Sequence, residues 1–223
     1  VLTRMLHEDA ALEGIGLVIF DEFHERSLNA DLGLALSLET QAVLRPELRL
    51  LVMSATLDGA AVARLLDDAP VIVSEGRTFP IDVRYLPRRA EQSIEGAVAG
   101  AICRALVENR GSVLAFLPGA SEIRRTHELL TSSATPPDVR VLPLFGAMPA
   151  AAQDEAILPA PAGTRKVVLA TSIAETSLTI EGVRVVVDSG LARVPAFSPR
   201  TGMSRLETVR VSRAAAEQRS GRA

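Results

Sequence analysis

The chain has 223 residues, of which 48% are hydrophobic and 23% are charged; this composition indicates a globular protein and excludes a disordered or fibrous chain. The single cysteine, Cys103, excludes an internal disulfide and a cysteine-based zinc site, and no apolar stretch is long enough to span a bilayer, so we expect a soluble cytoplasmic protein without a membrane partner. A net charge of −3 excludes indiscriminate binding of nucleic acid through bulk charge but leaves room for a local basic groove.

Short apolar runs alternate along the chain with longer stretches of helical periodicity, which is typical of an α/β protein with parallel sheets. In the first part the pattern predicts strands at 15–20, 48–53 and 71–73 and helices at 28–44 and 58–66. In the second part it predicts an extended segment at 81–86, strands at 112–117, 139–145, 165–170 and 183–187, and helices at 93–109, 150–158 and from the turn at 118–119 to residue 130. Alternating flanks around a turn with Pro and Gly predict a β-hairpin at 191–210.

A segment with the Gly and Pro content of an interdomain connection separates the two parts. We therefore expect a first domain at 1–76, a linker at 77–82 and a second domain at 83–223. The strands do not repeat at a fixed short period, which argues against a solenoid. Two α/β lobes fit this pattern better than one sheet.

Two carboxylates and an imidazole, those of Asp21, Glu22 and His24, directly follow the apolar run at 15–20. A continuous apolar run of this length is typical of a strand covered on both faces, and ligands of open α/β sheets bind outside the carboxyl ends of such strands. A carboxylate pair there can hold Mg²⁺ against the phosphates of a nucleoside triphosphate and polarise an attacking water. These residues alone leave a solvated acidic turn equally open.

Four short motifs occur in a fixed order. They are Asp-Glu-Phe-His at 21–24, Ser-Ala-Thr at 54–56, Ala-Thr-Ser-Ile-Ala-Glu-Thr-Ser-Leu-Thr-Ile at 170–180 and Gln-Arg-Ser-Gly-Arg-Ala at 218–223. Each motif alone is weak, but their order and their expected places beside strand ends resemble superfamily 2 helicases of the DEAH/RHA group, over essentially the whole chain. Phe23 stands where the group usually has Ala, which resembles a bacterial type within it.

The resemblance implies an ATP-fuelled motor of two RecA-like parallel-sheet lobes, here the C-terminal part of the first and most of the second. It implies nucleotide in the cleft between the lobes and a single strand of RNA, with DNA as the alternative, running across both. The site residues that it implies are Asp21 and Glu22 as catalytic groups and Mg²⁺ ligands, His24, Gln218 and Arg222 as further catalytic residues, Ser54 and Thr56 for coupling, Glu181 and Arg219 for nucleotide binding, and Arg4, Gly119, Gly146, Thr171, Ser177 and Thr179 for nucleic-acid binding.

Several departures and ordinary interpretations stand beside this assignment. Phe23 is expected to pack beneath the site, and Ser172 replaces the usual Asn. Relatives often offer an aromatic residue where the segment 155–158 has only aliphatic ones, and with 3% aromatic residues we expect backbone contacts and little sequence preference. The ordinary alternatives are a capping or packing role for His24, a surface arginine at Arg222 if the preceding motifs are set aside, and a plain connecting hairpin at 191–210. In relatives the hairpin is thought to help split the duplex.

The chain has one lysine, Lys166, outside any Gly-Lys-Ser/Thr setting, so it contains no phosphate-binding loop of that kind. The resemblance puts that loop ahead of Val1, and we therefore expect the chain alone to show no significant ATPase.

Two alternatives from other classes stay open. One is a catalytically degenerate module that binds nucleic acid or docks another protein, against which the retained hydrolytic residues argue. The other is a metal-dependent hydrolase that uses Asp21, Glu22, His24 and His7, against which the lack of a second carboxylate–histidine cluster argues. The oligomeric state is not specified by these patterns.

Overall fold

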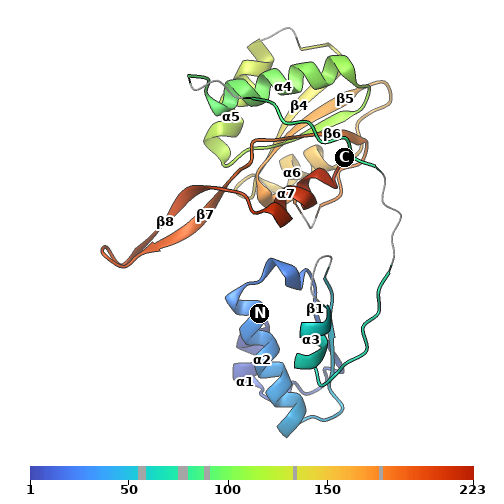
Figure 1. Cartoon of the computed structure of the whole chain (residues 1–223), viewed down its shortest axis with the longest axis vertical. Coiled ribbons are helices and arrows are strands. Elements are labelled where there is room, and N and C mark those ends of the chain that lie inside the picture. Colours follow the sequence, from blue (N-terminus) through green and yellow to red (C-terminus); the bar gives the residue numbers. More distant parts are fainter. Residues whose placement is uncertain (55–58, 75–79, 88–90, 133–134, 176–177) are drawn as a thin grey trace. The chain divides into compact units, whose positions relative to one another are not determined.

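The computed structural model describes residues 1–54, 59–74, 80–87, 91–132, 135–175 and 178–223. The chain divides into two compact units, Val1–Thr78 and Phe79–Ala223, which Figure 1 draws in blue to teal and in green to red. The linker expected at 77–82 lies partly outside the described residues.

The first unit is a parallel strand pair with helices. Its elements are α1 (Leu2–Glu8), β1 (Leu17–Phe20), the short 3-10 helix η1 (Phe23–Glu25), α2 (Leu28–Val43), β2 (Arg49–Val52) and α3 (Gly59–Leu65). The strands pair in register from Leu17 with Arg49 to Phe20 with Val52. The α2 helix begins after Ser27, whose hydroxyl accepts the N–H of Ala30, so a side-chain cap starts the crossover between the strands.

The hydrophobic core of the first unit lies on one face of this strand pair. Its buried members are Leu6, Leu12, Val18, Phe20, Phe23, Leu34 and Leu48. The Arg45 guanidinium donates to the carbonyls of Ala11 and Leu12, both at 3.0 Å, and so ties the loop before β1 to the end of α2.

Two expectations for this unit were wrong. The run at 71–73 forms no strand, and Ile72 is 90% exposed; apolar, β-branched residues need a neighbouring strand to pair with, and sequence pattern alone does not supply one. The β1 strand is not covered on both faces, because Leu17 and Ile19 are 46% and 51% exposed. Helix α1 was not predicted at all.

The second unit is built on a four-stranded parallel sheet of order β4-β5-β3-β6. Its elements are α4 (Ile94–Glu108), β3 (Ser112–Phe116), α5 (Ala120–Ser132), β4 (Val139–Leu144), α6 (Ala150–Ile157), β5 (Arg165–Ala170), η2 (Ser172–Ala174), β6 (Val183–Asp188), β7 (Leu191–Ser198), β8 (Met203–Arg210) and α7 (Arg213–Ser220). The predicted α/β fold with parallel sheets is confirmed. The extended segment expected at 81–86 joins no strand, and α7 was not predicted.

Helices cover both faces of this sheet, with α4 and α5 on one side and α6 and α7 on the other (Figure 1). Val113 and Ala115 of β3 pack in the core under α4 and α5. The alternate residues Leu114 and Phe116 pack in the core that includes Ala156 of α6, Ala174 and Ile180. Alternate side chains of β3 therefore belong to two cores, one on each face of the sheet, as expected of a central parallel strand.

Lys166, the single lysine, is 2% exposed inside this sheet. Its ammonium donates to the carbonyls of Ala156, Ile157 and Leu158 at 2.8, 3.1 and 2.6 Å. Burial lowers the pKa of Lys166, while the charge of Glu181 partly opposes that effect. The side chain therefore satisfies the carbonyls at the C-terminal end of α6, where a cation is favoured.

The predicted hairpin is confirmed. Strands β7 and β8 pair antiparallel from Leu191 with Arg210 to Ser198 with Met203, and the turn includes Gly202 at φ 65°, a conformation that glycine adopts without a steric penalty. The hairpin projects away from the body of the second unit (Figure 1). None of the described helices is both long and apolar enough to cross a bilayer.

Candidate functional site

The carboxylate segment of the first unit is fixed by a ladder that continues past the two strands. The N–H of Met53 donates to the carbonyl of Phe20 at 2.8 Å, and the N–H of Phe23 donates to the carbonyl of Met53 at 3.1 Å. Asp21 and Glu22 therefore lie at the same sheet edge as Ser54, which follows Met53. Thr56 lies outside the described residues.

The backbone of this segment has an unusual conformation at two places. Glu22 is at φ 50°, ψ 36° and Arg26 is at φ 47°, which is the left-handed region that residues with a side chain seldom adopt. The N–H of Glu22 donates to Oδ1 of Asp21 at 2.8 Å. The turn thus exposes Asp21 and leaves Glu22 half-buried, at a conformational cost that the rest of the unit must offset.

Phe23 anchors this turn. It is 4% exposed and packs edge-on against Phe20, with ring centroids 6.2 Å apart, while the Arg26 guanidinium lies 5.6 Å from the centroid of its ring. An aromatic side chain that packs under the segment was the expectation from sequence, and the burial agrees with it. The Phe23 ring belongs to the hydrophobic core of the first unit and so anchors the residue that follows the two carboxylates.

His24 lies against one of these carboxylates. Its side chain is 6% exposed, and Nε2 is 3.5 Å from Oε2 of Glu22. Among the described residues, no group of three or more His, Cys, Asp and Glu side chains could hold a metal ion by itself. The donors of Asp21 and Glu22 do fit Mg²⁺, because this ion takes oxygen ligands and commonly uses one or two carboxylates together with phosphates and water.

In the second unit, the sheet brings several predicted nucleic-acid residues to one edge. Hydrogen bonds beyond the strand ends join Leu117 N to Ala170 O at 2.8 Å and Thr171 N to Leu144 O at 3.2 Å. Gly119, Gly146 and Thr171 therefore follow the carboxyl ends of three neighbouring strands. Gly119 is buried, Gly146 is exposed and Thr171 is half-buried.

The remaining predicted nucleic-acid residues are more scattered in the chain. Thr179 is exposed, and Ser177 lies outside the described residues. Arg4 belongs to the first unit, where it is exposed on α1 with its Nε 3.9 Å from Oε1 of Glu8.

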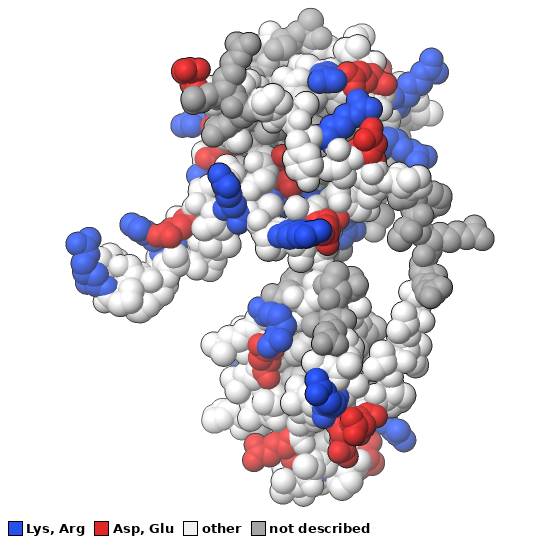
Figure 2. Space-filling view, in the orientation of Figure 1, with Lys and Arg blue, Asp and Glu red and all other residues white. Residues whose placement is uncertain are grey.

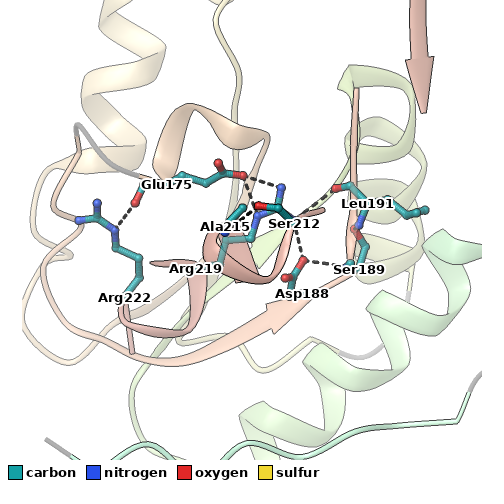
Figure 3. Close-up of polar contacts among 9 residues, drawn as sticks. Glu175, Asp188, Ser189, Leu191, Ser212, Ala215, Arg219 and Arg222 are labelled. Carbon is teal, nitrogen blue, oxygen red and sulfur yellow. Dashed lines mark hydrogen bonds and ion pairs between the residues drawn. The ribbon is translucent and has the colours of Figure 1, made fainter. Parts of the chain in front are cut away.

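Arg219 on α7 is the centre of a buried ion network (Figure 3). Its Nε donates to Oε1 of Glu175 at 2.7 Å, and its Nη1 donates to Oδ1 of Asp188 at 2.7 Å and to the carbonyl of Leu191 at 3.3 Å. The guanidinium also lies 4.8 Å from the ring centroid of Phe116. Its side chain is 1% exposed, so every face of this cation is in contact with the unit itself.

The assignment of Arg219 to nucleotide binding stays a prediction. In this structure its guanidinium contacts two carboxylates, a carbonyl and a ring and is shielded from solvent, which favours a structural role for this side chain. Sequence reasoning missed Glu175 and Asp188 as its partners because they lie far before it in the chain. The signal that could have indicated them is an acidic residue at the end of a strand and another in the loop after β5, on the side where α7 returns.

Arg222 and Gln218 stand on either side of Arg219 along the chain. The Nε of Arg222 donates to the backbone carbonyl of Glu175 at 2.6 Å (Figure 3), and its Nη1 lies 3.4 Å from the carbonyl of Leu178. Both Gln218 and Arg222 are half-buried, and Glu181 is exposed. The arginine predicted to face the phosphate thus contacts the backbone of Glu175 and Leu178.

A family model described as "Helicase conserved C-terminal domain" matches residues 97–223. Over its whole length the chain is 57% identical to the ATP-dependent RNA helicase HrpB of Escherichia coli, and it spans 27% of that protein. It is 41% identical over 97% of its length to the chloroplastic ATP-dependent RNA helicase DEAH12 of Arabidopsis thaliana, of which it spans 12%.

Solved structures agree with these relatives. The crystal structure of the Escherichia coli DEAH/RHA helicase HrpB superposes with a TM-score of 0.91 at 56% identity, over 99% of this chain and 28% of that one. The chain thus spans about a quarter of the length of this bacterial relative.

Proposed function

The chain belongs to the helicase conserved C-terminal domain family, in its DEAH/RHA group, and from this premise we propose that it is the part of an ATP-dependent RNA helicase that couples ATP hydrolysis to movement along a single strand. The observation that carries the proposal is the pair of carboxylates after β1 together with Arg222, which follows helix α7. A binding module has no need of both.

In this proposal the units are two RecA-like lobes, with 1–76 as the C-terminal part of the first lobe, 77–82 as the linker and 83–223 as most of the second lobe. The parallel sheets with helices and the projecting hairpin support the assignment. The chain has no phosphate-binding loop of the Gly-Lys-Ser/Thr kind, so we propose that a further part of the protein supplies it.

Asp21, Glu22, Gln218 and Arg222 serve one triphosphate in this proposal. Asp21 and Glu22 would hold Mg²⁺, which when bound neutralises developing negative charge on the phosphates. Glu22 orients and deprotonates the attacking water, and His24, beside Glu22, relays the state of that carboxylate to the rest of the lobe. Ser54, at the neighbouring strand end, and Thr56 couple hydrolysis to movement, Glu181 contacts the nucleotide, and Arg222 stabilises charge on the γ-phosphate.

RNA is the proposed strand, with DNA as the alternative. Gly119, Gly146, Thr171, Ser177 and Thr179 of the second unit and Arg4 of the first would contact the backbone, which carries no sequence information. Three arginines of the hairpin 191–210 are exposed, namely Arg200, Arg205 and Arg210, and Figure 2 shows basic side chains along the hairpin and at its tip. In a chain of net charge −3, this segment supports a local attraction for phosphates, and we propose that it helps to split the duplex.

The test is hydrolysis of ATP by the full-length protein with Mg²⁺ and single-stranded RNA. We expect RNA to stimulate hydrolysis, Glu22→Gln to abolish it, and Arg222→Ala to lower kcat by about a thousandfold. Glu13→Gln changes an exposed glutamate of the same unit and should leave hydrolysis unaltered.

Other outcomes would favour the alternatives. Binding of RNA without turnover indicates a docking module, and cleavage without nucleotide indicates a hydrolase. The present chain alone should show no significant ATPase, and steady hydrolysis by it that is lost in Glu22→Gln would contradict the need for a separate phosphate-binding loop.

A further inference from the structure

The outer part of the β7–β8 hairpin has large apolar side chains in solvent. Phe197, Met203 and Leu206 are 65%, 65% and 67% exposed. A two-stranded hairpin without packing on its faces is marginally stable by itself. The direction in which this hairpin points is therefore set by the contacts at its base.

One of these contacts is made by Arg193, which pairs with Thr208 near the base of the ladder. Its Nη2 donates to Oε1 of Glu122 in the first turn of α5 at 2.8 Å, and both of its terminal nitrogens lie 3.4 Å from Oγ of Ser121. The side chains of Arg193 and Glu122 are 32% and 14% exposed, so this ion pair is largely withdrawn from solvent and is less screened than a surface pair.

Glu122 is itself held in place for this contact. Its Oε2 accepts the hydroxyl of Ser121 at 3.0 Å, and it stands in the first turn of α5, where the helix dipole favours a negative charge. The acceptor is thus oriented by its own helix, and the guanidinium of the hairpin completes the arrangement.

The residue just before α5, Gly119, leaves the space that the same guanidinium occupies. A Cβ atom at Gly119 would lie 2.5 Å from Nη1 and 2.9 Å from Cζ of Arg193, closer than van der Waals contact allows. Any side chain at position 119 would therefore displace the end of Arg193 from Glu122. Gly119 follows β3 at the sheet edge where we have proposed contacts to the nucleic-acid backbone.

We propose that Arg193 and Glu122 form a latch that fixes the hairpin to the N-terminal end of α5, so that the hairpin and the turn at Gly119 move as one part. Arg193 is then a positioning residue for strand separation, a role that rests on the function proposed above. Strands of eight residues reach about 25 Å, so a tilt of about 15° at the base would move the tip by about 6 Å. A small change of angle at the latch therefore produces a large displacement of the hairpin tip.

Hydrogen exchange tests the latch in the full-length protein without reference to catalysis. Arg193→Ala and Glu122→Ala should each raise amide exchange across 191–210 by about three- to tenfold, and the double variant should add little to either. Arg205→Ala is the matched control, because it removes an exposed ion pair with Glu207 on the same hairpin. Unchanged exchange in both latch variants would overturn the latch.

The yield of strand separation tests the positioning role. Arg193→Ala should lower the number of duplexes separated per ATP hydrolysed by about five- to tenfold, with RNA-stimulated kcat within about twofold of the parent, and Arg193→Lys should recover part of the loss. Damage to the fold would lower hydrolysis and separation together, and would overturn the role, as would an unchanged yield. A parent that separates no duplexes would refute the proposed function, and the exchange data would still decide the latch.

Discussion

The two regions proposed to meet the triphosphate are built in opposite ways. In the first unit, Asp21 and Glu22 sit on a backbone turn that is held from beneath by Phe23. In the second, Arg222 follows a helix that is held by the buried cation of Arg219 and its two carboxylates. Apolar packing tolerates gradual change, whereas a buried charge network fails when one member is removed. Variants of each region should therefore lose stability for different reasons.

The largest effect should come from the apolar anchor. Phe23→Ala removes a ring that is 4% exposed and should lower the free energy of unfolding of the first unit by about 4 kcal/mol, because the core cannot close over a cavity of that size. Denaturant titration followed by hydrogen exchange in peptides of residues 1–54 measures this. Phe197→Ala, a change at a 65% exposed ring of the hairpin, is the control and should leave that unit unaltered.

Loss of the buried cation should come next. Arg219→Met keeps the bulk of the side chain but leaves Glu175 and Asp188 without their partner, so we expect the second unit to lose about 3 kcal/mol of stability. The same titration, followed in peptides of 91–132 and 178–223, measures it. Arg213→Met removes a 93% exposed arginine from the same helix and should change the stability of the second unit little. An equal loss of stability in both variants would contradict the expectation that the buried network contributes more than the exposed ion pair.

A smaller effect is expected where a cation satisfies a helix end. Lys166→Met leaves three carbonyls at the end of α6 without a donor and should destabilise the second unit by about 2 kcal/mol near neutral pH. Arg140 lies opposite Lys166 in the neighbouring strand and is exposed, so Arg140→Met is the matched control in the same denaturation measurement.

The pH dependence of the same side chain has a definite sign. Burial lowers the pKa of Lys166 in the folded unit below its ordinary value of 10.5, so between the folded pKa and 10.5 the unfolded chain binds more protons. The free energy of unfolding should rise with pH through that window, as the cost of burying the charge is relieved. Denaturation at several alkaline pH values should show this rise in the parent, and a rise of the same size in Lys166→Met would contradict it.

The smallest expected effect concerns the turn itself. At Glu22 the backbone is left-handed, so Glu22→Gly should be more stable than Glu22→Ala by about 1 kcal/mol, although both lose the carboxylate. Glu39 lies exposed in the middle of α2, where the same pair of substitutions should have the opposite order, since glycine weakens a helix interior. Thermal unfolding of the four variants compares them directly.

Hydrophobic periodicity, together with polar motifs at the expected strand ends, predicted most of the fold. Apolar runs predicted all four strands of the sheet in the second unit, and alternating residues predicted the hairpin. Each of these strands has a partner strand within the chain. The run at 71–73 has the same composition but no partner strand, and no pattern within it could say so. Helices α1 and α7 were missed because they are only seven and eight residues long, and what fixes α7 is tertiary contact rather than an apolar stripe.

The candidate site was predictable by residue type but not by partner. The segment 21–24 was located because carboxylates after an apolar run are informative by themselves. The sequence did not indicate that Glu175 and Asp188 neutralise the charge of Arg219 in the fold. Sequence spacing does not reveal which of two arginines three residues apart is buried.

The single lysine also gives this sequence a single cleavage site for a lysine-specific protease. A lysine-specific protease can cleave this sequence only between Lys166 and Val167, in β5, which lies between β4 and β3 in the sheet. A protease can reach that bond only when β5 separates from β4 and β3. The rate at which the two fragments appear would therefore measure the rate at which the sheet of the second unit opens.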